Sequence, residues 1–490
     1  MKLFTRSPFA LPAIQRELRV LSALLALAVL GACAQLRPVS LPPAGVAFEP
    51  PPAWSSTKAA DAPPGDGAAA LASWWRRFND PLLEQLVARA LQANTSIAQA
   101  RGALRQARAA RDVSAAGLAA TVTGSGQAQR SKLDGTAAAN SYNLGFDARW
   151  EPDVFGANGH ALAASAATLQ ASAASLAAAQ VSVAAEVARS YIELRGVQLR
   201  LAIARDNLAS QQSTLDITNW RVQAGMLTSL EQQQAITAAA QAAAQLPPLE
   251  SAAAQLRHAL AVLCGQAPAA LDALLAPALA IPEAGAQLAL SLPAATLRQR
   301  ADVRAAEFEL EAARARVGQA DAARYPVFRL DGSLGLSGLG FGASGGTLLR
   351  TLLGAVTGNV LDGGAGKAQL EVQRGALAQA QAVYLATLLG ALQEVEDALS
   401  ALAGDRVRLD HLRLAAGAAD SAALLARQRY ASGLVDFQTV LETQRALYSS
   451  QDGVAATSAA LGGDLVRLYK ALGGGWQPDG DPAGYAGGTP

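Results

Sequence analysis

Side chains able to do acid–base, nucleophilic or metal chemistry are few and scattered in this sequence. Its only histidines are His160, His258 and His411, and none stands at zinc-ligand spacing from another histidine or from a cysteine. No local motif assembles a Ser-His-Asp grouping. The glycine-rich run 363–366 lacks the Lys-Ser/Thr pattern of a phosphate-binding loop. We therefore predict that the protein is not an enzyme and holds no cofactor and no metal.

One cysteine stands where covalent lipid chemistry is expected. A basic start up to Arg19 precedes the apolar run 20–30, which is too short to span a bilayer and typical of a signal peptide. The run ends in Leu-Gly-Ala before Cys33, which resembles the bacterial lipobox. We predict a signal peptide over 1–32, a diacylglycerol and palmitate anchor on Cys33, and, because Ala34 follows, export to the outer membrane. The alternative is an uncleaved apolar N-terminus with an incidental cysteine.

Composition limits the remaining function classes. Aromatic residues make up 5% of the 490 residues and the formal net charge is +1. A nearly neutral chain has no charge-driven affinity for nucleic acid, so none is predicted as a partner. Alanine dominates and long stretches have no proline, which favours helices packed closely through small side chains.

The elements that must position any functional residue occur twice. The sequence RVQAG at 221–225 returns as RYASG at 429–433, and neighbouring segments repeat at nearly the same offset. Such internal repetition indicates a duplicated architecture. We predict a lipidated tether over 33–73, a first repeat over 74–264 with its tip at 225, an equatorial connection over 265–295, a second repeat over 296–472 with its tip at 433, and a disordered tail over 473–490.

Each repeat combines a β-hairpin with a very long helix. Apolar and polar residues alternate within 120–150, most clearly over 142–150, and again within 327–361. The polar stretch 130–140 is expected to join the first two strands as a loop. Segments of about ten alternating residues are typical of strands in outer-membrane barrels. The proline-free runs 159–222 and 366–431 follow as long helices, and Gly225 and Gly433 permit the chain to reverse after each.

Four strands cannot close a barrel by themselves. Unpaired backbone groups at an open sheet edge are costly in hydrocarbon, so other copies of the chain must complete the barrel. A dimer, a trimer and a tetramer would give eight, twelve or sixteen strands, and all three are permitted. The strand pattern alone does not choose among them.

The chain resembles the TolC-like outer membrane efflux proteins, in the lipoprotein branch typified by OprM and NodT. The segments that carry the resemblance, in order, are 74–94, 141–156, 184–195, 300–326, 361–364 with 393–399, and 429–448. The resemblance implies a membrane α+β fold in which a homotrimer forms a twelve-stranded transmembrane β-barrel, continued by a barrel of long helices into the periplasm. It also implies two partners besides the outer membrane lipid, namely a periplasmic adaptor (membrane fusion) protein and an inner membrane transporter of the RND type.

The same resemblance assigns roles to residues around the two glycine turns. Turn residues are expected to contact the adaptor; they are Ala224, Gly225, Met226, Ser432, Gly433 and Leu434. Residues on either side of these turns are expected to form the periplasmic aperture; they are Glu442, Thr439, Glu231, Arg221 and Arg429. Glu442 and Thr439 stand where the family often has aspartates, so the acidic ring is thinned. Arg221 and Arg429 are expected to hold neighbouring helices together by ion pairs.

The leading functional hypothesis is a passive outer membrane exit duct for a tripartite efflux pump of a Gram-negative bacterium, exporting drugs or other toxic small molecules. Two alternatives remain open at this point. One is the outer membrane component of a type I protein secretion system, which has the same fold. The other is a periplasmic coiled-coil scaffold lipoprotein that forms no pore.

Overall fold

The computed structural model describes residues 48–55, 71–132, 134–135, 137–283, 293–338 and 347–476. The predicted signal peptide, Cys33, most of the tether and the tail from 477 onward lie outside the described residues. The described chain forms two units. One contains segments 109–167 and 310–381 and carries the strands; the other contains the helical segments 48–108, 168–309 and 382–476.

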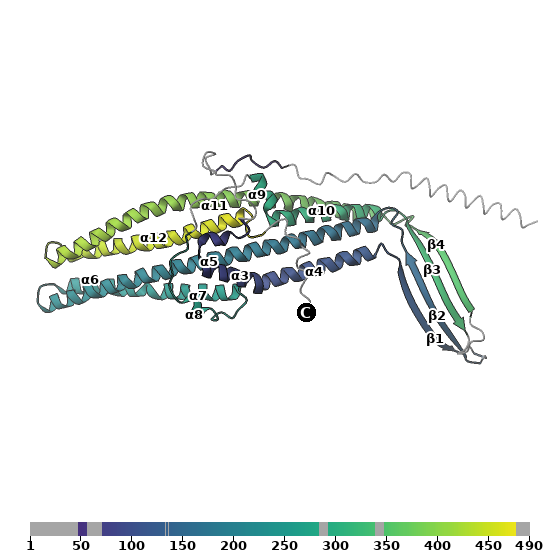
Figure 1. The fold of residues 1–490 in the computed structure, drawn as a ribbon, viewed down its shortest axis with the longest axis horizontal. Helices are drawn as coiled ribbons and strands as arrows, with labels where there is room; N and C mark the ends of the chain where they lie inside the picture. Colours follow the sequence, from purple (N-terminus) through teal and green to yellow (C-terminus); the bar gives the residue numbers. More distant parts are fainter. Residues whose placement is uncertain are drawn as a thin grey trace, which may run out of the picture. The chain divides into compact units, whose positions relative to one another are not determined.

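The first unit contains one antiparallel four-stranded sheet. Its strands are β1 (Thr121–Ser131), β2 (Ala139–Trp150), β3 (Val327–Gly338) and β4 (Thr347–Thr357). They lie side by side in chain order, so β1 and β4 are the two edges (Figure 1). The two predicted hairpins are present, with different ends. Arg130 belongs to β1 rather than to the connecting loop, and β4 ends at Thr357, before Leu361.

Alternation within the strands separates an apolar face from a polar face. Directly paired residues lie on the same face of a sheet, and Leu144 pairs with Leu336, which in turn pairs with Leu348. On the opposite face Asp331 accepts from Arg149 and Arg329, at 3.0 and 2.9 Å. A sheet with one apolar face and one charged face is suited to separate lipid from water.

The second unit is helical. The elements that lie wholly within it are η1 (Trp74–Phe78), α3 (Pro81–Ala93), α6 (Ser229–Ala244), α7 (Leu246–Leu263), α8 (Asp272–Leu275), α9 (Pro293–Gln299) and α12 (Phe437–Ala471). Four other helices have residues in both units: α4 (Thr95–Ala116), α5 (Ala157–Gln223), α10 (Ala301–Ala322) and α11 (Ala365–Ala431). The two proline-free runs are thus continuous helices, α5 and α11, of 67 residues each.

Windows in α5 and α11 are long and apolar enough to cross a membrane. That property is weak evidence for a span, because a helix packed inside a protein passes the same test. In α5, 56% of the window is buried by the rest of the chain.

The helix boundaries follow local sequence. Asp80 caps α3 by accepting from the backbone N–H groups of Leu82 and Leu83, and Pro81 occupies the first helical position. After the first tip the chain returns as two helices, α6 and α7, which are separated at Gln245. The division occurs there because two prolines lie in the first turn of α7. Gly265 ends the repeat with φ of +69°, and a side chain there would meet the carbonyl oxygen of Ala93 at 2.4 Å.

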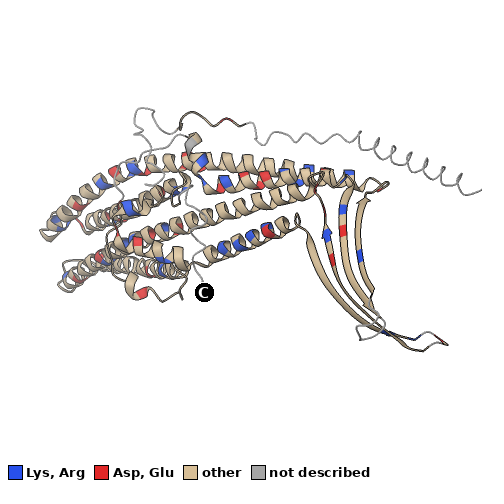
Figure 2. Cartoon of the chain, turned by 45° about the vertical axis from the view of Figure 1, so that its right-hand side comes forward, with Lys and Arg blue, Asp and Glu red and all other residues tan. Residues whose placement is uncertain are grey.

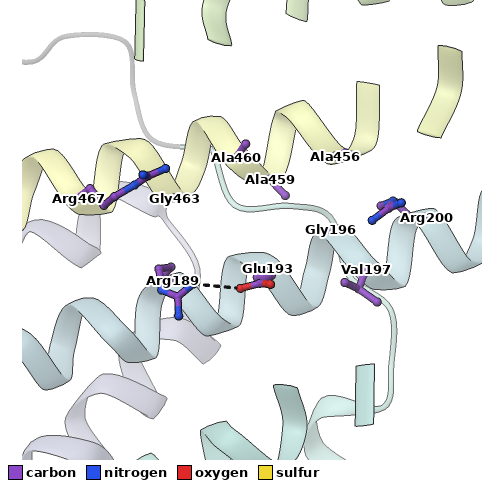
Figure 3. Close-up of a pocket in the computed structure, with 10 residues that line it drawn as sticks. All are labelled: Arg189, Glu193, Gly196, Val197, Arg200, Ala456, Ala459, Ala460, Gly463 and Arg467. Carbon is purple, nitrogen blue, oxygen red and sulfur yellow. Dashed lines mark hydrogen bonds and ion pairs between the residues drawn. The ribbon is translucent and has the colours of Figure 1, made fainter. Parts of the chain in front are cut away.

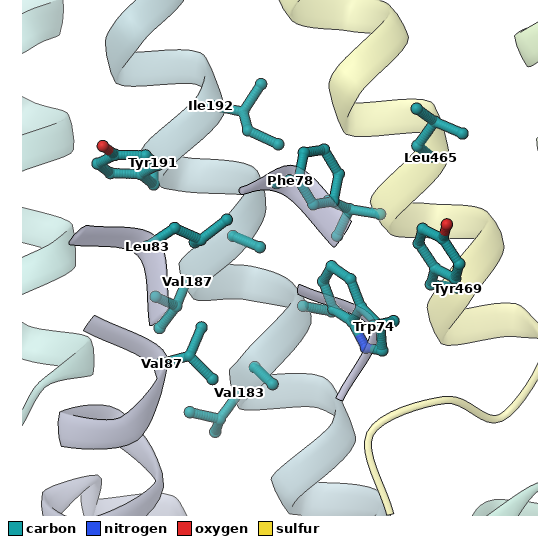
Figure 4. Close-up of a cluster of buried hydrophobic side chains, with 14 of the residues drawn as sticks. Trp74, Phe78, Leu83, Val87, Val183, Val187, Tyr191, Ile192, Leu465 and Tyr469 are labelled. Carbon is teal, nitrogen blue, oxygen red and sulfur yellow. The ribbon is translucent and has the colours of Figure 1, made fainter. Parts of the chain in front are cut away.

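The principal hydrophobic core of this unit gathers around Trp74 (Figure 4). The Trp74 ring is fully buried and stacks on Tyr469 of α12, with ring centres 5.4 Å apart. Helix α5 contributes Val183, Val187 and Ile192 to the same cluster. The N-terminal elements η1 and α3 are therefore bound to the middle of α5 and to the end of α12.

Helices α5 and α12 approach each other closely through small residues. A Cβ atom on Gly196 would lie 2.5 Å from that of Ala459, and one on Gly462 would lie 2.9 Å from Ile192. Close approach brings polar groups of the two helices together as well. Arg200 donates two hydrogen bonds to Asp452, at 2.7 and 3.0 Å. Because α5 belongs to the first helical hairpin and α12 to the second, these contacts join the two repeats.

Candidate functional site

Both long helices end in the same turn geometry. Gly225 has φ of +72° and Gly433 has φ of +73°. After α5, Met226 N–H donates to the Arg221 carbonyl and Gly225 N–H to the Val222 carbonyl. The equivalent pair follows α11, where Leu434 and Gly433 donate to Arg429 and Tyr430. This pair of hydrogen bonds requires a residue in the left-handed conformation at the turn. Glycine adopts that conformation without strain.

Arg221 joins the two tips, although not by an ion pair. Its guanidinium lies over the Tyr430 ring, 4.6 Å from the ring centre. It also donates to the carbonyls of Tyr430 and Ala431, both at 3.5 Å. The expected ion pair is therefore replaced by a cation–π contact, because the facing side chain on α11 is aromatic. Arg429 forms no ion pair within the part of the chain that the structure describes.

A small hydrophobic cluster lies beneath this contact. Its buried members are Ala235, Ala238, Ala426, Tyr430, Phe437, Val440 and Leu441. The rings of Tyr430 and Phe437 lie 5.8 Å apart. Further from the tip, Gln444 of α12 donates to Ser210 and Thr214 of α5, at 3.2 and 3.3 Å. The two hairpins are thus joined by polar and apolar contacts over several helical turns.

The carboxylates near the tips have different local roles. Glu231 is engaged in a capping box, in which its side chain accepts from the Thr228 backbone at 3.0 Å. Asp436 caps α12 and accepts from the backbone N–H of Thr439 at 2.9 Å. Glu442 accepts only a neighbouring Gln438 amide, at 3.0 Å. Of the three, Glu442 therefore has the carboxylate least occupied by backbone capping.

Capping makes the tips sensitive to acid. Hydrogen bonds from Thr228 lower the pKa of Glu231 from 4.5, and those from Thr439 lower the pKa of Asp436 from 3.8. A lowered pKa contributes stability that is present above the unfolded pKa and lost as the pH falls through the folded pKa. We expect the protection of amides at the start of α12, measured relative to their intrinsic exchange rate at each pH, to fall below about pH 4. Asp436→Asn keeps an acceptor without a titration in that range, so an unchanged acid response in this variant would contradict the role of Asp436.

The predicted turn residues are accessible. Met226 and Leu434, which follow the two glycines, are 67% and 75% exposed, and Trp220 on α5 is 67% exposed. The positions of Ala224 and Ser432 are exposed as well. Large apolar side chains at the end of a hairpin are suited to contact another protein.

A cavity of about 520 Å³ lies between α5 and α12, lined by small residues and by Arg189, Arg200 and Arg467 (Figure 3). Each arginine already has a carboxylate partner. Arg189 contacts Glu186 and Glu193, Arg200 contacts Asp452, and Arg467 contacts Asp464. The arrangement gives structural ion pairs between and along the helices rather than an anion site.

The structure brings together some of the predicted residues and not others. Arg221 and the second turn are in contact, while Glu231 and Thr439 belong to separate caps. Tyr430, Asp436 and Gln444 were not singled out from sequence. The sequence did contain a helix-capping signal for Asp436, because this residue stands just before α12 with Thr439 three residues later. No comparable sequence signal marks a residue such as Tyr430, whose role depends on a contact with another helix.

The residues of metal and thiol chemistry are not gathered into a site. Among the described residues no group of three or more His, Cys, Asp or Glu side chains has a geometry that could hold a metal ion. Cys264 is buried, and burial raises the pKa of its thiol.

Comparison with known proteins gives consistent similarities. A family model described as outer membrane efflux protein matches residues 86–266 and 292–474. The chain is 32% identical over 415 residues to nodulation protein T of Rhizobium leguminosarum bv. viciae, covering 84% of this chain and 86% of that protein. It is 31% identical to outer membrane protein OprJ of Pseudomonas aeruginosa, covering 93% and 95%. The solved outer-membrane channel OprN superposes with a TM-score of 0.80 at 32% identity, over 89% of this chain and 99% of that one.

Proposed function

Because the chain belongs to the outer membrane efflux protein family, we propose that it forms the outer membrane exit duct of a tripartite pump of the RND type. Its cargo would be drugs or other toxic small molecules. The single observation that carries this proposal is the sheet, which has an apolar face, a charged face and two unpaired edges. Such a sheet is stable in a membrane only when other copies close it into a water-filled barrel.

A homotrimer satisfies that requirement in the way that is usual for the family. Three copies of the four-stranded sheet would give a twelve-stranded barrel, in which β4 of one copy pairs with β1 of the next. The long helices α5 and α11 with their hairpin partners would form a helical barrel extending into the periplasm. A lipid anchor on Cys33 would attach each copy to the inner leaflet of the outer membrane.

The tips are proposed as the periplasmic aperture and the adaptor contact. The exposed turns at Met226 and Leu434 would meet the adaptor protein, together with their neighbours Ala224, Gly225, Ser432 and Gly433. Glu442 is the proposed aperture carboxylate, since its side chain is the least engaged in capping. Arg221 would hold the two hairpins of one copy together, and Arg429, without an ion pair in the described residues, would reach toward an adjacent copy.

The duct is tested by electrical recording of the purified full chain in planar bilayers. We expect discrete ion conductance from a detergent-resistant trimer, and a lower preference for cations over anions in Glu442→Gln, because three carboxylates are lost at the narrowest point. Glu250→Gln is the matched control, since Glu250 is paired with Arg205 within the first hairpin.

Two outcomes would count against the proposal. A stable trimer without conductance, even when the tips are opened by substitution, would favour the scaffold alternative. Equal changes of ion preference in the Glu442 and Glu250 variants would remove Glu442 from the aperture while leaving the duct intact.

A further inference from the structure

The apolar face of the sheet carries two charged residues among the described strands. This face is defined by register and consists of Val122, Gly124, Gly126, Ala128 and Arg130 of β1, the even-numbered residues of β2 and β3, and Leu348, Arg350, Leu352, Gly354 and Val356 of β4. Figure 2 shows how sparse charges are on the strands. The two charged members are Arg130 and Arg350, and both are exposed.

These two arginines differ from those on the polar face. Arg149 and Arg329 both donate to Asp331, so the polar face neutralises its cations internally. Arg130 and Arg350 have no carboxylate on their own face within the described strands, where the neighbouring residues are aliphatic, aromatic, glycine or asparagine. An arginine in hydrocarbon is unfavourable unless its guanidinium reaches a polar partner at the interface. The described strands therefore supply no anionic partner for either guanidinium.

Both arginines lie toward the same end of the sheet. Arg130 is the penultimate residue of β1, and Arg350 is the fourth residue of β4. These strand ends adjoin the hairpin connections, whereas the helices adjoin the opposite ends. In an outer membrane duct with periplasmic helices, the hairpin connections face the outside. The two side chains then lie at the level of the outer leaflet.

The two arginines also lie on the two edge strands. Strand order makes β1 and β4 the edges, and barrel closure brings β4 of one copy beside β1 of the next. The register aligns Arg350 with Leu334, Phe146 and Gly124, so within one sheet it lies six residues nearer the helical ends of the strands than Arg130. The strands of a closed barrel are staggered, and that stagger sets the offset between Arg350 and the Arg130 of the next copy. Lys132, directly after β1, adds a third exposed cation nearby.

We propose that Arg350 of one copy and Arg130 of the next form a binding site, at each junction between copies, for the phosphate groups of a phosphorylated glycolipid in the outer leaflet. The site rests on the proposed function, because it needs the closed barrel. Guanidinium groups bind phosphate oxygens in pairs, and the surrounding apolar residues contact the acyl chains. A soluble anion would not use the apolar surround, which is why a lipid is the proposed occupant.

The site is tested by titrating the detergent-solubilised full-length trimer with bis-phosphorylated lipid A and counting bound lipids by native mass spectrometry. We expect three lipids per trimer. Removing one surface cation weakens attachment to an anionic lipid about five-fold. Arg130→Gln and Arg350→Gln are each expected to weaken binding by that factor, and the double variant by about 25-fold. Arg149→Gln, which removes an arginine from the polar face, should bind like the wild type.

Several results would overturn the site. They are wild-type affinity in the double variant, equal affinity of the wild type for dephosphorylated lipid A, and complete displacement of the lipid by inorganic phosphate. If the double glutamine variant does not assemble, the double lysine variant Arg130→Lys with Arg350→Lys replaces it. This variant keeps the charge, and we expect an intermediate loss of affinity for lipid A. Binding of dephosphorylated lipid A by the lysine variant with wild-type affinity would also contradict the proposal. Conductance is recorded in parallel, so a conducting trimer without the lipid preference rejects the site and leaves the duct standing.

Discussion

Arg221→Ala is expected to increase the open fraction of the channel at least ten-fold. The Arg221–Tyr430 contact is the junction between the two turns, formed by a ring stacked under the guanidinium and by two carbonyl acceptors. A cation–π contact contributes about 0.5–2 kcal/mol, and the proposed trimer would lose three of them together. The summed loss of about 1.5–6 kcal/mol shifts a two-state equilibrium by one to four orders of magnitude if opening separates the hairpins.

The measurement is single-channel recording at fixed voltage, with adaptor absent. Arg205→Ala is the matched control, because Arg205 is on the same helix but pairs with Glu250 within the first hairpin, at 2.9 Å. Tyr430→Leu should reproduce the opening, since it removes the ring and keeps an apolar side chain. If Arg205→Ala and Arg221→Ala open the channel equally, the effect is a general loosening of helices and the junction has no special role.

A second junction lies further from the tip and joins α5 to α12. Arg200 and Asp452 form a partly buried bidentate pair, which raises the pKa of Arg200. Still further from the tip, the Gly196–Ala459 contact leaves no space for a side chain. When the helices separate at the tip, they therefore stay joined at this junction. The contacts permit the helices to bend between the tip and the junction.

Local chemistry made much of the fold predictable from sequence. Proline-free alanine-rich runs indicated α5 and α11, alternation indicated the hairpins, and the repeated glycines indicated two turns that do have positive φ. The ends of strands were less predictable: Arg130 looked like a loop residue because it is charged, and it is a strand residue because Asn140 pairs with it. Polarity alone does not mark the end of a strand, because the pairing partner decides where the strand ends.

Roles that depend on partners were the least predictable. The aperture role of Glu231 stays a prediction, whereas its capping box with Thr228, three residues before it, was not foreseen from its place in the repeat. Arg221 and Arg429 are equivalent by duplication, and only Arg221 meets an aromatic ring. Repeats copy a residue into two positions, but the facing helix decides what each copy contacts.

Trp74→Ala is expected to cost about 3–5 kcal/mol in the stability of each copy, the loss typical of a fully buried tryptophan. Trp74 stacks on Tyr469 and meets Phe78 edge-on at 6.2 Å, so its removal leaves a cavity between η1, α5 and α12. The C-terminal end of α12 would lose its attachment to α5, because Leu465 and Tyr469 belong to the same cluster. Thermal unfolding of the detergent-solubilised protein, followed by helical circular dichroism, measures the loss.

Two further variants separate packing from other effects of the substitution. Trp74→Phe keeps a ring against Tyr469 and should lose less, since Trp74 Nε1 has no hydrogen-bond partner among the described residues. Trp220→Ala removes an exposed tryptophan and should leave the melting temperature near that of the wild type. If the Trp74→Ala and Trp220→Ala proteins had the same melting temperature, η1 and α3 would not be what holds α5 and α12 together. The Gly196–Ala459 and Arg200–Asp452 contacts would then suffice to join the two repeats.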